Sequence, residues 1–226
     1  LSSAASDVYK RQAKNITITN SELRNLGIGG IRIGNGSSDC AITNSAIHDI
    51  SSSGIFIGNN TGHNHGYCDP GTDVTGVVVR NNYITRTGLD IFGSSAICAL
   101  YTSDTVIDHN EVCYTTYTGI SLGWGWDWKN APCSGNNTVS NNYIHDTGKT
   151  IHDGGSFYSL GLQEGTKVFG NYLHHHSDGL YDKDGGLYTD EGSTGLELYN
   201  NVVGDGVYWW QKIWTTNIKD LSLIHI

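Results

Sequence analysis

The stretch Val79-Arg80-Asn81-Asn82-Tyr83-Ile84 decides the fold, because the chain repeats its pattern along most of its length. Similar stretches begin at residues 18, 42, 107, 139, 168 and 198, each with a polar turn between apolar positions. The Ser or Asn of this turn stands at positions 21, 45, 82, 110, 142, 171 and 201, at spacings of 24, 37, 28, 32, 29 and 30 residues. Self-similarity at such a period is typical of a solenoid, in which each repeat forms one coil.

Each repeat is predicted to consist of strands. An alternating strand leads into the Asn turn, and a second short strand follows a Gly, as in Gly54-Ile55-Phe56-Ile57 and Gly119-Ile120-Ser121-Leu122. No segment keeps an apolar period of 3.6 residues, which a helix requires. We therefore predict an all-β, single-stranded parallel β-helix of about seven coils, stacked ~4.8 Å apart and truncated at both ends. The Asn column is interpreted as structural, since Asn tolerates left-handed backbone and stacked Asn side chains bond between coils.

The two ends of the chain are not expected to be native. Asp7-Val8-Tyr9-Lys10-Arg11-Gln12 and Leu221-Ser222-Leu223-Ile224-His225-Ile226 can be encoded by opposite strands of one DNA word, which resembles a transposon end used in sequencing libraries. The chain also contains no Met. Residues 1–12 and 221–226 are therefore predicted to be adapter-derived. Residues 13–220 are predicted to be a partial β-helix domain of a longer protein.

The composition excludes several classes of protein. The 30 Gly, 2 Pro, 6 Trp and 13 Tyr among 226 residues fit neither a disordered tail nor a helical bundle. A formal net charge of -9 disfavours binding to nucleic acid through phosphates. No apolar run approaches the ~18 residues that a membrane span needs. We expect a secreted or periplasmic bacterial protein whose signal peptide lies outside this fragment.

Carboxylates gather in the last coils and predict a catalytic site there. Residues 146–205 contain ten Asp or Glu and only three Lys. Two neighbouring coils carry Asp-Gly-Gly before a strand, at Asp153 and Asp184. Two-residue alternation along the strands predicts that both carboxylates, and Phe157, point outward. The two carboxylates would then lie about 5 Å apart on neighbouring coils. At that spacing the charge of one carboxylate raises the pKa of the other. Asp190, at the far end of its strand, is the rival for the second carboxylate.

Aromatic residues and histidines near these acids are candidates for substrate binding. Trp124, Trp126 and Trp128 lie in one polar loop, where indole faces suit sugar rings; a hydrophobic plug against the rod is the alternative. The other candidates are His152, His175, Tyr188 and Glu191, although alternation turns Glu191 inward. His48 and His145 occupy equivalent Ile-His-Asp turns and are interpreted as turn residues. We expect no metal site, Cys98 and Cys113 as buried thiols, and Cys68 and Cys133 as a possible pair.

Three stretches carry a resemblance to a known family. They are His152-Asp153-Gly154-Gly155-Ser156-Phe157-Tyr158-Ser159-Leu160-Gly161, Gly170-Asn171-Tyr172-Leu173-His174, and Gly186-Leu187-Tyr188-Thr189-Asp190-Glu191-Gly192-Ser193. They resemble the right-handed parallel β-helix glycoside hydrolases, most of all glycoside hydrolase family 141, whose members act on xylan or as fucosidases. The resemblance implies Asp153 and Asp190 as the catalytic pair, whereas the stacking argument favours Asp184.

Three functions follow from these patterns. The first is a glycoside hydrolase acting on xylan or a fucosylated polysaccharide, without a cofactor, with an Asp pair as acid and as nucleophile or base. The second is a polysaccharide lyase, which in so acidic a groove needs Ca²⁺ to neutralise a uronate. The third is a carbohydrate-binding or adhesin β-helix without catalysis, because this fold alone does not define a function. A poly- or oligosaccharide is the expected partner in all three.

Overall fold

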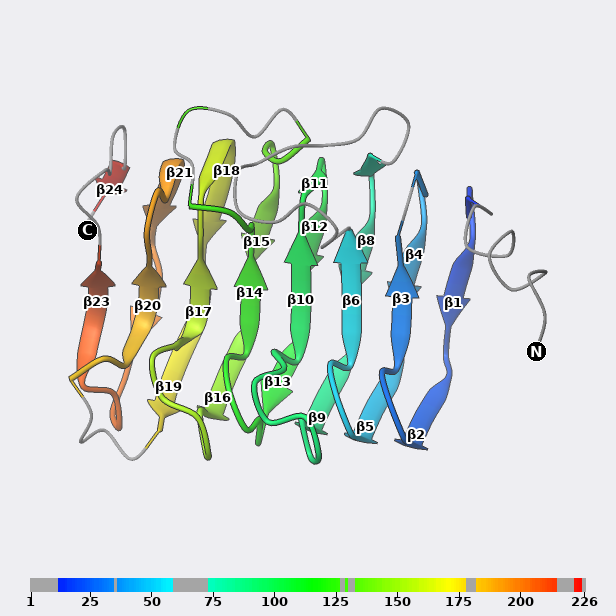
Figure 1. The fold of residues 1–226 in the computed structure, drawn as a ribbon, viewed down its shortest axis with the longest axis horizontal. Helices are drawn as coiled ribbons and strands as arrows, with labels where there is room; N and C mark the ends of the chain where they lie inside the picture. Colours follow the sequence, from blue (N-terminus) through cyan, green and yellow to red (C-terminus); the bar gives the residue numbers. More distant parts are fainter. Residues whose placement is uncertain are drawn as a thin grey trace.

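The computed structural model describes residues 12–34, 36–58, 73–126, 129, 133–177, 182–214 and 222–224. Every regular element among them is a β-strand, and neighbouring strands pair in parallel along one rod (Figure 1). The predicted all-β parallel β-helix is therefore confirmed. The described part of the chain contains no helix with the length and apolarity that a membrane span requires.

The strands form three long sheets, which we number in the order in which one coil enters them. Sheet 1 contains β1 (Thr17–Thr19), β4 (Ala41–Thr43), β8 (Val78–Arg80), β12 (Val106–Asp108), β15 (Thr138–Ser140), β18 (Leu162–Phe169), β21 (Thr194–Tyr199) and β24 (Ser222–Ile224). Sheet 2 contains β2 (Glu22–Leu26), β5 (Ala46–Ile50), β9 (Tyr83–Thr87), β13 (Glu111–Cys113), β16 (Tyr143–Thr147), β19 (Tyr172–His176) and β22 (Val202–Val203). Sheet 3 contains β3 (Ile31–Ile33), β6 (Ile55–Gly58), β10 (Ile97–Leu100), β14 (Ile120–Leu122), β17 (Gly155–Ser159), β20 (Gly185–Thr189) and β23 (Trp209–Ile213). A short pair, β7 (Val74–Thr75) and β11 (Thr102–Ser103), lies beside them.

A coil therefore has three strands, where the sequence pattern predicted two. The Asn turn separates the strand of sheet 1 from that of sheet 2, so each repeated stretch such as 79–84 covers parts of two strands. The pairing register of sheet 1 places Thr17 beside Ala41, Ala41 beside Val78 and Val78 beside Val106. These steps equal the first three repeat spacings.

The core is a stack of branched aliphatic side chains that point into the rod. In sheet 1 the inward row consists of Ile18, Ile42, Val79, Ile107, Val139, Val168 and Leu198, and all but the first are buried. Parallel pairing brings equivalent residues of successive coils into contact, so a single apolar position per strand builds a continuous core.

The Asn column forms a buried ladder, as predicted. The side-chain amides of Asn82, Asn110, Asn142 and Asn171 each donate to the Oδ1 of the Asn one coil later, at 2.9–3.0 Å. The same Oδ1 also accepts the backbone N–H of the preceding coil, as at Asn142, where Asn110 N lies 3.0 Å away. The residue before each ladder position has positive φ, for example 53° at Asn141. This explains the Asn-Asn pairs, because Asn adopts the left-handed conformation more readily than most side chains.

One alignment predicted from the sequence is wrong. Tyr158 pairs with Tyr188, and Gly155 pairs with Gly185 rather than Gly186. Phe157 consequently points inward, where it packs in the core beside Ile120, and not outward as alternation from Gly155 predicted. The Gly-Gly pairs have no side chains, so their sequence alone does not show which Gly of one coil pairs with which Gly of the next.

Candidate active site

A small aromatic cluster covers the outer face of sheet 3 at the late coils. Tyr158 of β17 and Tyr188 of β20 are neighbours in the sheet, with ring centroids 5.2 Å apart in an edge-on arrangement. Leu160 and Trp124 pack against them, apart from the main core. Both tyrosine side chains are therefore held rigidly, and each directs its hydroxyl to a carboxylate.

Asp190 lies directly after β20, at the far end of the strand. Its Oδ2 accepts the Tyr158 hydroxyl at 2.5 Å, and its Oδ1 accepts the backbone N–H of Glu191 at 2.7 Å. Burial raises the pKa of Asp190, and the charge of Asp153 raises it further; the two hydrogen bonds lower it but do not cancel the rise. A carboxyl group with a raised pKa is suited to hold and deliver a proton.

Asp153 lies before β17, at the opposite end of the same face. Its Oδ1 accepts the Tyr188 hydroxyl at 3.1 Å, and its backbone carbonyl accepts the Tyr117 hydroxyl at 2.8 Å. The backbone is held in the left-handed region, with φ of 68°. Gly154 permits this tight approach, since a Cβ there would lie 2.8 Å from the Tyr117 ring.

The two tyrosines connect these carboxylates across the sheet. Tyr158 hydrogen-bonds Asp190 while Tyr188 hydrogen-bonds Asp153, and the two rings are in contact. Burial followed by the negative charge of Asp190 raises the pKa of both phenols, so both stay protonated hydrogen-bond donors. Of the predicted site residues, Asp153 and Asp190 thus each bond one tyrosine of this cluster, and Tyr188 is one of the two tyrosines.

Asp184 is not on this face, and its predicted outward orientation is wrong. The residue is fully buried. Its carboxylate accepts the backbone N–H of Asp153 at 2.9 Å and contacts His152 Nδ1 at 2.7 Å. The buried His176 Nε2 lies 3.9 Å away, and burial lowers the pKa of that imidazole. Asp184 therefore holds the turn that carries Asp153 and is a positioning residue.

The other predicted binding residues separate into those near the site and those away from it. Trp124 contacts the tyrosine cluster, and Trp126, 45% exposed, packs edge-on against Trp124 at 5.4 Å. Trp128 lies outside the described residues. His175 is exposed on β19 of sheet 2, next to His174, and so belongs to another face of the rod.

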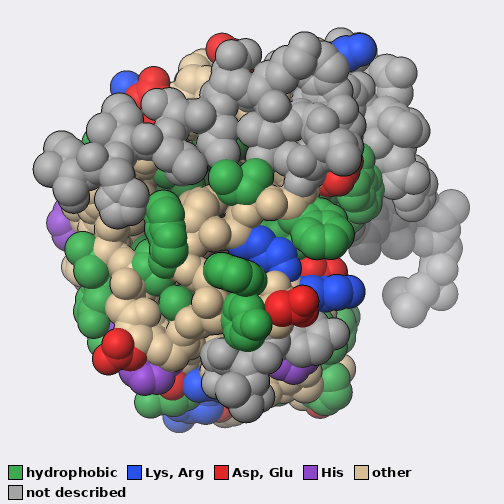
Figure 2. Space-filling model, turned by 90° about the vertical axis from the view of Figure 1, so that its left-hand side faces the viewer, with side chains coloured by type: hydrophobic (Ala, Val, Ile, Leu, Met, Phe, Trp, Pro, Cys, Tyr) green, Lys and Arg blue, Asp and Glu red, His purple; other side chains and the backbone are tan. Residues whose placement is uncertain are grey.

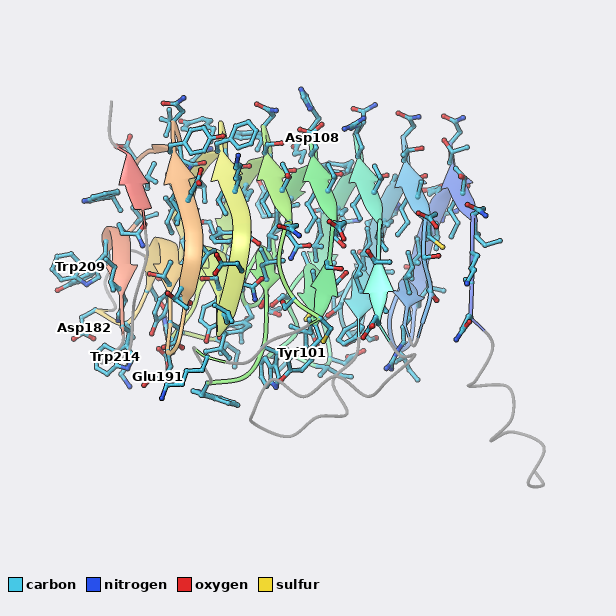
Figure 3. The ribbon with its side chains drawn as sticks, turned by 90° about the horizontal axis from the view of Figure 1, so that it is seen from above. Tyr101, Asp108, Asp182, Glu191, Trp209 and Trp214 are labelled. Carbon is cyan, nitrogen blue, oxygen red and sulfur yellow. The ribbon has the colours of Figure 1, made fainter. Side chains whose placement is uncertain are left out.

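His152 and Glu191 remain close to the candidate site. His152 is partly exposed while bonded to Asp184. Glu191 is half-buried, contrary to the inward orientation expected from alternation. Figure 3 shows Glu191 near Trp214 at the sheet 3 side of the last coils, opposite Asp108 of sheet 1.

The coil that contains β23 carries a lysine and several exposed aromatic side chains that the sequence analysis did not single out. Lys212 is the neighbour of Tyr188 in the sheet, and its Nζ lies 5.2 Å from the Tyr188 ring and 5.3 Å from the Trp214 ring. The ammonium group donates to the carbonyl of Asp182 at 2.7 Å, and burial lowers its pKa. The same coil exposes Tyr208, Trp209, Trp210, Ile213 and Trp214, and Figure 2 shows apolar side chains gathered around charged ones on this end.

Sequence reasoning missed Tyr158, Tyr117 and Lys212. A signal for Tyr158 was present, since Phe157-Tyr158-Ser159 and Leu187-Tyr188-Thr189 share an apolar residue, a Tyr and a small hydroxyl residue. Alignment on these side chains instead of the Gly pairs gives the observed register. Tyr117 and Lys212 reach the site from neighbouring coils, where the repeat pattern carries no comparable signal.

Comparisons with known proteins agree with this architecture. The family model for a right-handed β-helix region matches residues 6–203. A solved glycoside hydrolase is 28% identical over 91% of this chain, with a TM-score of 0.74, and the match covers 37% of the hydrolase. No curated protein matches the sequence.

Two more distant structures share the fold. One is the A-module of a mannuronan C-5 epimerase from Azotobacter vinelandii, at 15% identity and a TM-score of 0.55, covering 92% of this chain and 58% of the epimerase chain. The other is a surface protein and adhesin of Streptococcus pneumoniae, at 14% identity and a TM-score of 0.51, covering 93% of this chain and 67% of that chain. The family match extends over most of the chain, and the chain belongs to the right-handed β-helix family.

Proposed function

We propose that this β-helix is part of a glycoside hydrolase whose site is the outer face of sheet 3. The observation that carries the proposal is the carboxylate pair Asp153 and Asp190, each hydrogen-bonded to one of two touching tyrosines. The similarity to a solved glycoside hydrolase supports it, although this chain spans only 37% of that protein.

The raised pKa of Asp190 suggests different roles for Asp190 and Asp153. Asp190, in its protonated form, gives its proton to the glycosidic oxygen as the bond to the anomeric carbon breaks. Asp153, as a carboxylate, either attacks the anomeric carbon or takes a proton from the attacking water. The Tyr188 hydroxyl holds the Asp153 carboxylate in place for this step.

The substrate proposed is a neutral polysaccharide, either xylan or a fucosylated glycan. Sugar rings present C–H faces that stack on indoles, and Trp124 and Trp126 provide such faces beside the tyrosine cluster. Such a substrate is external to the cell, which accords with the proposed secreted or periplasmic location. Neither the reaction nor the substrate requires a cofactor.

The test is a screen of the full-length protein on xylan and fucosylated glycans, with Asp190→Asn and Asp153→Asn as variants. Each variant is expected to lose roughly 10²–10⁴-fold in kcat, the usual contribution of an acid or base. Asp182→Asn is the matched control, because this exposed Asp is in the same coil and contacts Lys212 through its backbone carbonyl. Full activity in both Asp153→Asn and Asp190→Asn would overturn the assignment.

The position of Lys212 favours a second candidate function, that of a lyase acting on a uronate. Its ammonium group lies over Tyr188 and is a candidate to neutralise a sugar carboxylate. A lyase also needs a base for the neighbouring proton, and the raised pKa values of Tyr158 and Tyr188 keep both phenols protonated, so neither is available as that base. Formation of an unsaturated sugar from polyuronate by the same protein would establish the lyase, whereas a new reducing end without unsaturation supports the hydrolase.

A further inference from the structure

A cluster of three different ligand types lies on sheet 2, outside the proposed active site. Glu111 and Cys113 flank the inward-pointing Val112 on β13, and His145 is the direct neighbour of Cys113 on β16 (Figure 1). One ligand atom from each of Glu111, Cys113 and His145 lies within 4.8 Å of the other two. Cys113 is buried and His145 nearly so, which distinguishes the cluster from a solvated acidic patch.

The separation of the imidazole and the carboxylate matches the spacing of two ligands on a tetrahedral metal and is long for a direct hydrogen bond. His145 Nε2 and Glu111 Oε1 are 3.4 Å apart. Two donors at about 2.0–2.1 Å from a tetrahedral zinc ion lie roughly 3.3–3.4 Å from each other. A direct hydrogen bond between a ring N–H and a carboxylate is usually 2.7–2.9 Å.

The surroundings fix the imidazole in the orientation that metal binding requires. His145 Nδ1 bonds Asp146 Oδ2 at 3.0 Å, which leaves Nε2 to face Glu111. The ring stacks on Tyr143, with centroids 4.3 Å apart, and on His174 at 5.2 Å. A carboxylate on the second ring nitrogen is the usual support of a metal-binding His, because it sets the tautomer and increases basicity.

The chain contains a matched cluster without the thiol. Glu22 and Arg24 of β2 and His48 of β5 occupy the same relative positions, and Asp49 bonds His48 Nδ1 at 2.7 Å. Arg24 stands where Cys113 stands in the other cluster. There His48 Nε2 and Glu22 Oε1 close to 3.0 Å, and hydrogen bonds to Asp49 and Glu22 raise the pKa of His48, so this pair forms an ordinary ion pair.

We propose that Glu111, Cys113 and His145 form a Zn²⁺ site that links β13 to β16. Thiolate, imidazole and carboxylate together select zinc over calcium or magnesium, which prefer oxygen ligands alone. Three protein ligands leave the fourth tetrahedral position to water. Zn²⁺ binds the thiolate form of a Cys and displaces the thiol proton on binding, so the affinity falls as the pH is lowered. This proposal departs from the expectation, drawn from the sequence, that the chain has no metal site and that His145 is a turn residue.

The experiment titrates the reduced full chain with Zn²⁺ by calorimetry and with Co²⁺ by absorption spectroscopy. We expect one Zn²⁺ per chain at this site and a thiolate-to-Co²⁺ charge-transfer band. Cys113→Ser removes the band and weakens Zn²⁺ binding at least about tenfold, and Asp146→Asn weakens it roughly 10–100-fold. His48→Gln is the matched control and leaves both readouts unchanged, because its cluster has no thiol.

A second variant tests the site in case Cys113→Ser does not fold. Glu111 is only partly buried, so Glu111→Gln is expected to fold and still bind Zn²⁺ at least about tenfold more weakly. Bound Zn²⁺ is also expected to raise the Tm of the wild type and of His48→Gln, and to leave the Tm of Cys113→Ser unchanged. Absence of the charge-transfer band in the wild type, or the same band and affinity in Cys113→Ser, would overturn the proposal.

Discussion

At the scale of single residues, the proposed site depends on which hydroxyl faces which carboxylate. Tyr158 donates to Asp190, a bond that favours the ionised carboxylate, while burial favours the neutral acid. A charge-assisted hydrogen bond contributes about 1.5–3 kcal/mol. The balance between these opposing effects sets the pH at which Asp190 gives up its proton.

Replacement of Tyr158 by Phe tests this balance. Loss of the hydroxyl destabilises the carboxylate, so the pKa of Asp190 rises further. If Asp190 is the general acid, the alkaline limb of the kcat/KM profile moves to higher pH; if it is a base, the acidic limb moves instead. We expect the alkaline limb to move, with a rate loss of roughly 10–100-fold below it. Tyr117→Phe is the control, because Tyr117 bonds the backbone of Asp153.

Substitution of Asp184 is expected to reduce stability, whereas substitution of Asp190 is expected to reduce catalysis. Asp184→Ala removes the buried carboxylate that accepts the Asp153 N–H and contacts the His152 ring, and is expected to lower the unfolding free energy by about 2–4 kcal/mol. Asp190→Asn is expected to change it by less than about 1 kcal/mol, since burial already disfavours its charge. Urea unfolding measures both, and equal losses in the two variants would contradict the distinction.

The sequence therefore predicted two of the three proposed acids in contact with the tyrosine cluster and misplaced the third. The Asp-Gly-Gly turn predicted Asp153, and the family resemblance favoured Asp190 over Asp184 as its partner; both Asp153 and Asp190 bond a tyrosine of the cluster. Asp184 was misplaced because alternation describes side chains within a straight strand, and Asp184 precedes β20 at a corner. There a backbone N–H and two imidazoles draw the carboxylate inward.

At the scale of the elements, the Asn ladder holds successive coils in register. Asn142, for example, accepts two hydrogen bonds from Asn110 of the preceding coil and donates two to Asn171 of the next, all inside the rod. The ladder therefore contributes to stability through satisfied buried amides rather than through apolar area.

Asn142→Ala is expected to lower the unfolding free energy by about 2–4 kcal/mol. The substitution removes the side-chain acceptor of the buried Asn110 backbone N–H and one acceptor of the Asn110 side-chain amide. Asn200→Gly is the control, because Asn200 is an exposed residue with φ of 53° outside the ladder, a conformation that Gly adopts without strain. It is expected to change stability by no more than about 0.5 kcal/mol, and chemical denaturation compares the two.

The elements themselves were predictable where side chains repeat. The Asn column was visible because every coil needs the same buried amide, and its spacings equal the register of sheet 1. The division of each coil into three strands was not visible, because the strands of sheets 1 and 2 are short and joined by the Asn turn. The clusters on sheet 2 were missed for a related reason, since Glu111, Cys113 and His145 come from two coils with different outward residues.

At the scale of the whole molecule, titratable groups on several coils give stability a common dependence on pH. Burial alone raises the pKa of Asp108, but hydrogen bonds from His109, Asn141 and Ser140 outweigh it and hold the value at about 2. Hydrogen bonds from Arg86 and His48 hold the pKa of Asp49 well below its ordinary 3.8. Burial lowers the pKa of His174 and His176 below 6.5.

These shifts predict that acid destabilises the fold in two stages. The buried histidines bind protons more weakly in the folded chain than in the unfolded chain, so stability falls as the pH drops below about 6.5. The carboxylates with lowered pKa stabilise the fold above about pH 3.8, and this contribution is lost as the pH falls toward 2. His48, whose pKa is raised, opposes the first stage, because its contribution is present below 6.5 and is lost as the pH rises.

The Tm measured between pH 7.5 and pH 2.5 is therefore expected to fall throughout, most steeply below about pH 4. Asp108→Asn should flatten the lower stage, because this variant cannot take up the proton that unfolding allows at Asp108. His176→Asn should flatten the upper stage alone, since it removes a buried imidazole that charges only on unfolding. A Tm that stays constant from pH 6.5 to pH 4 would show that these histidines do not oppose protonation in the folded rod.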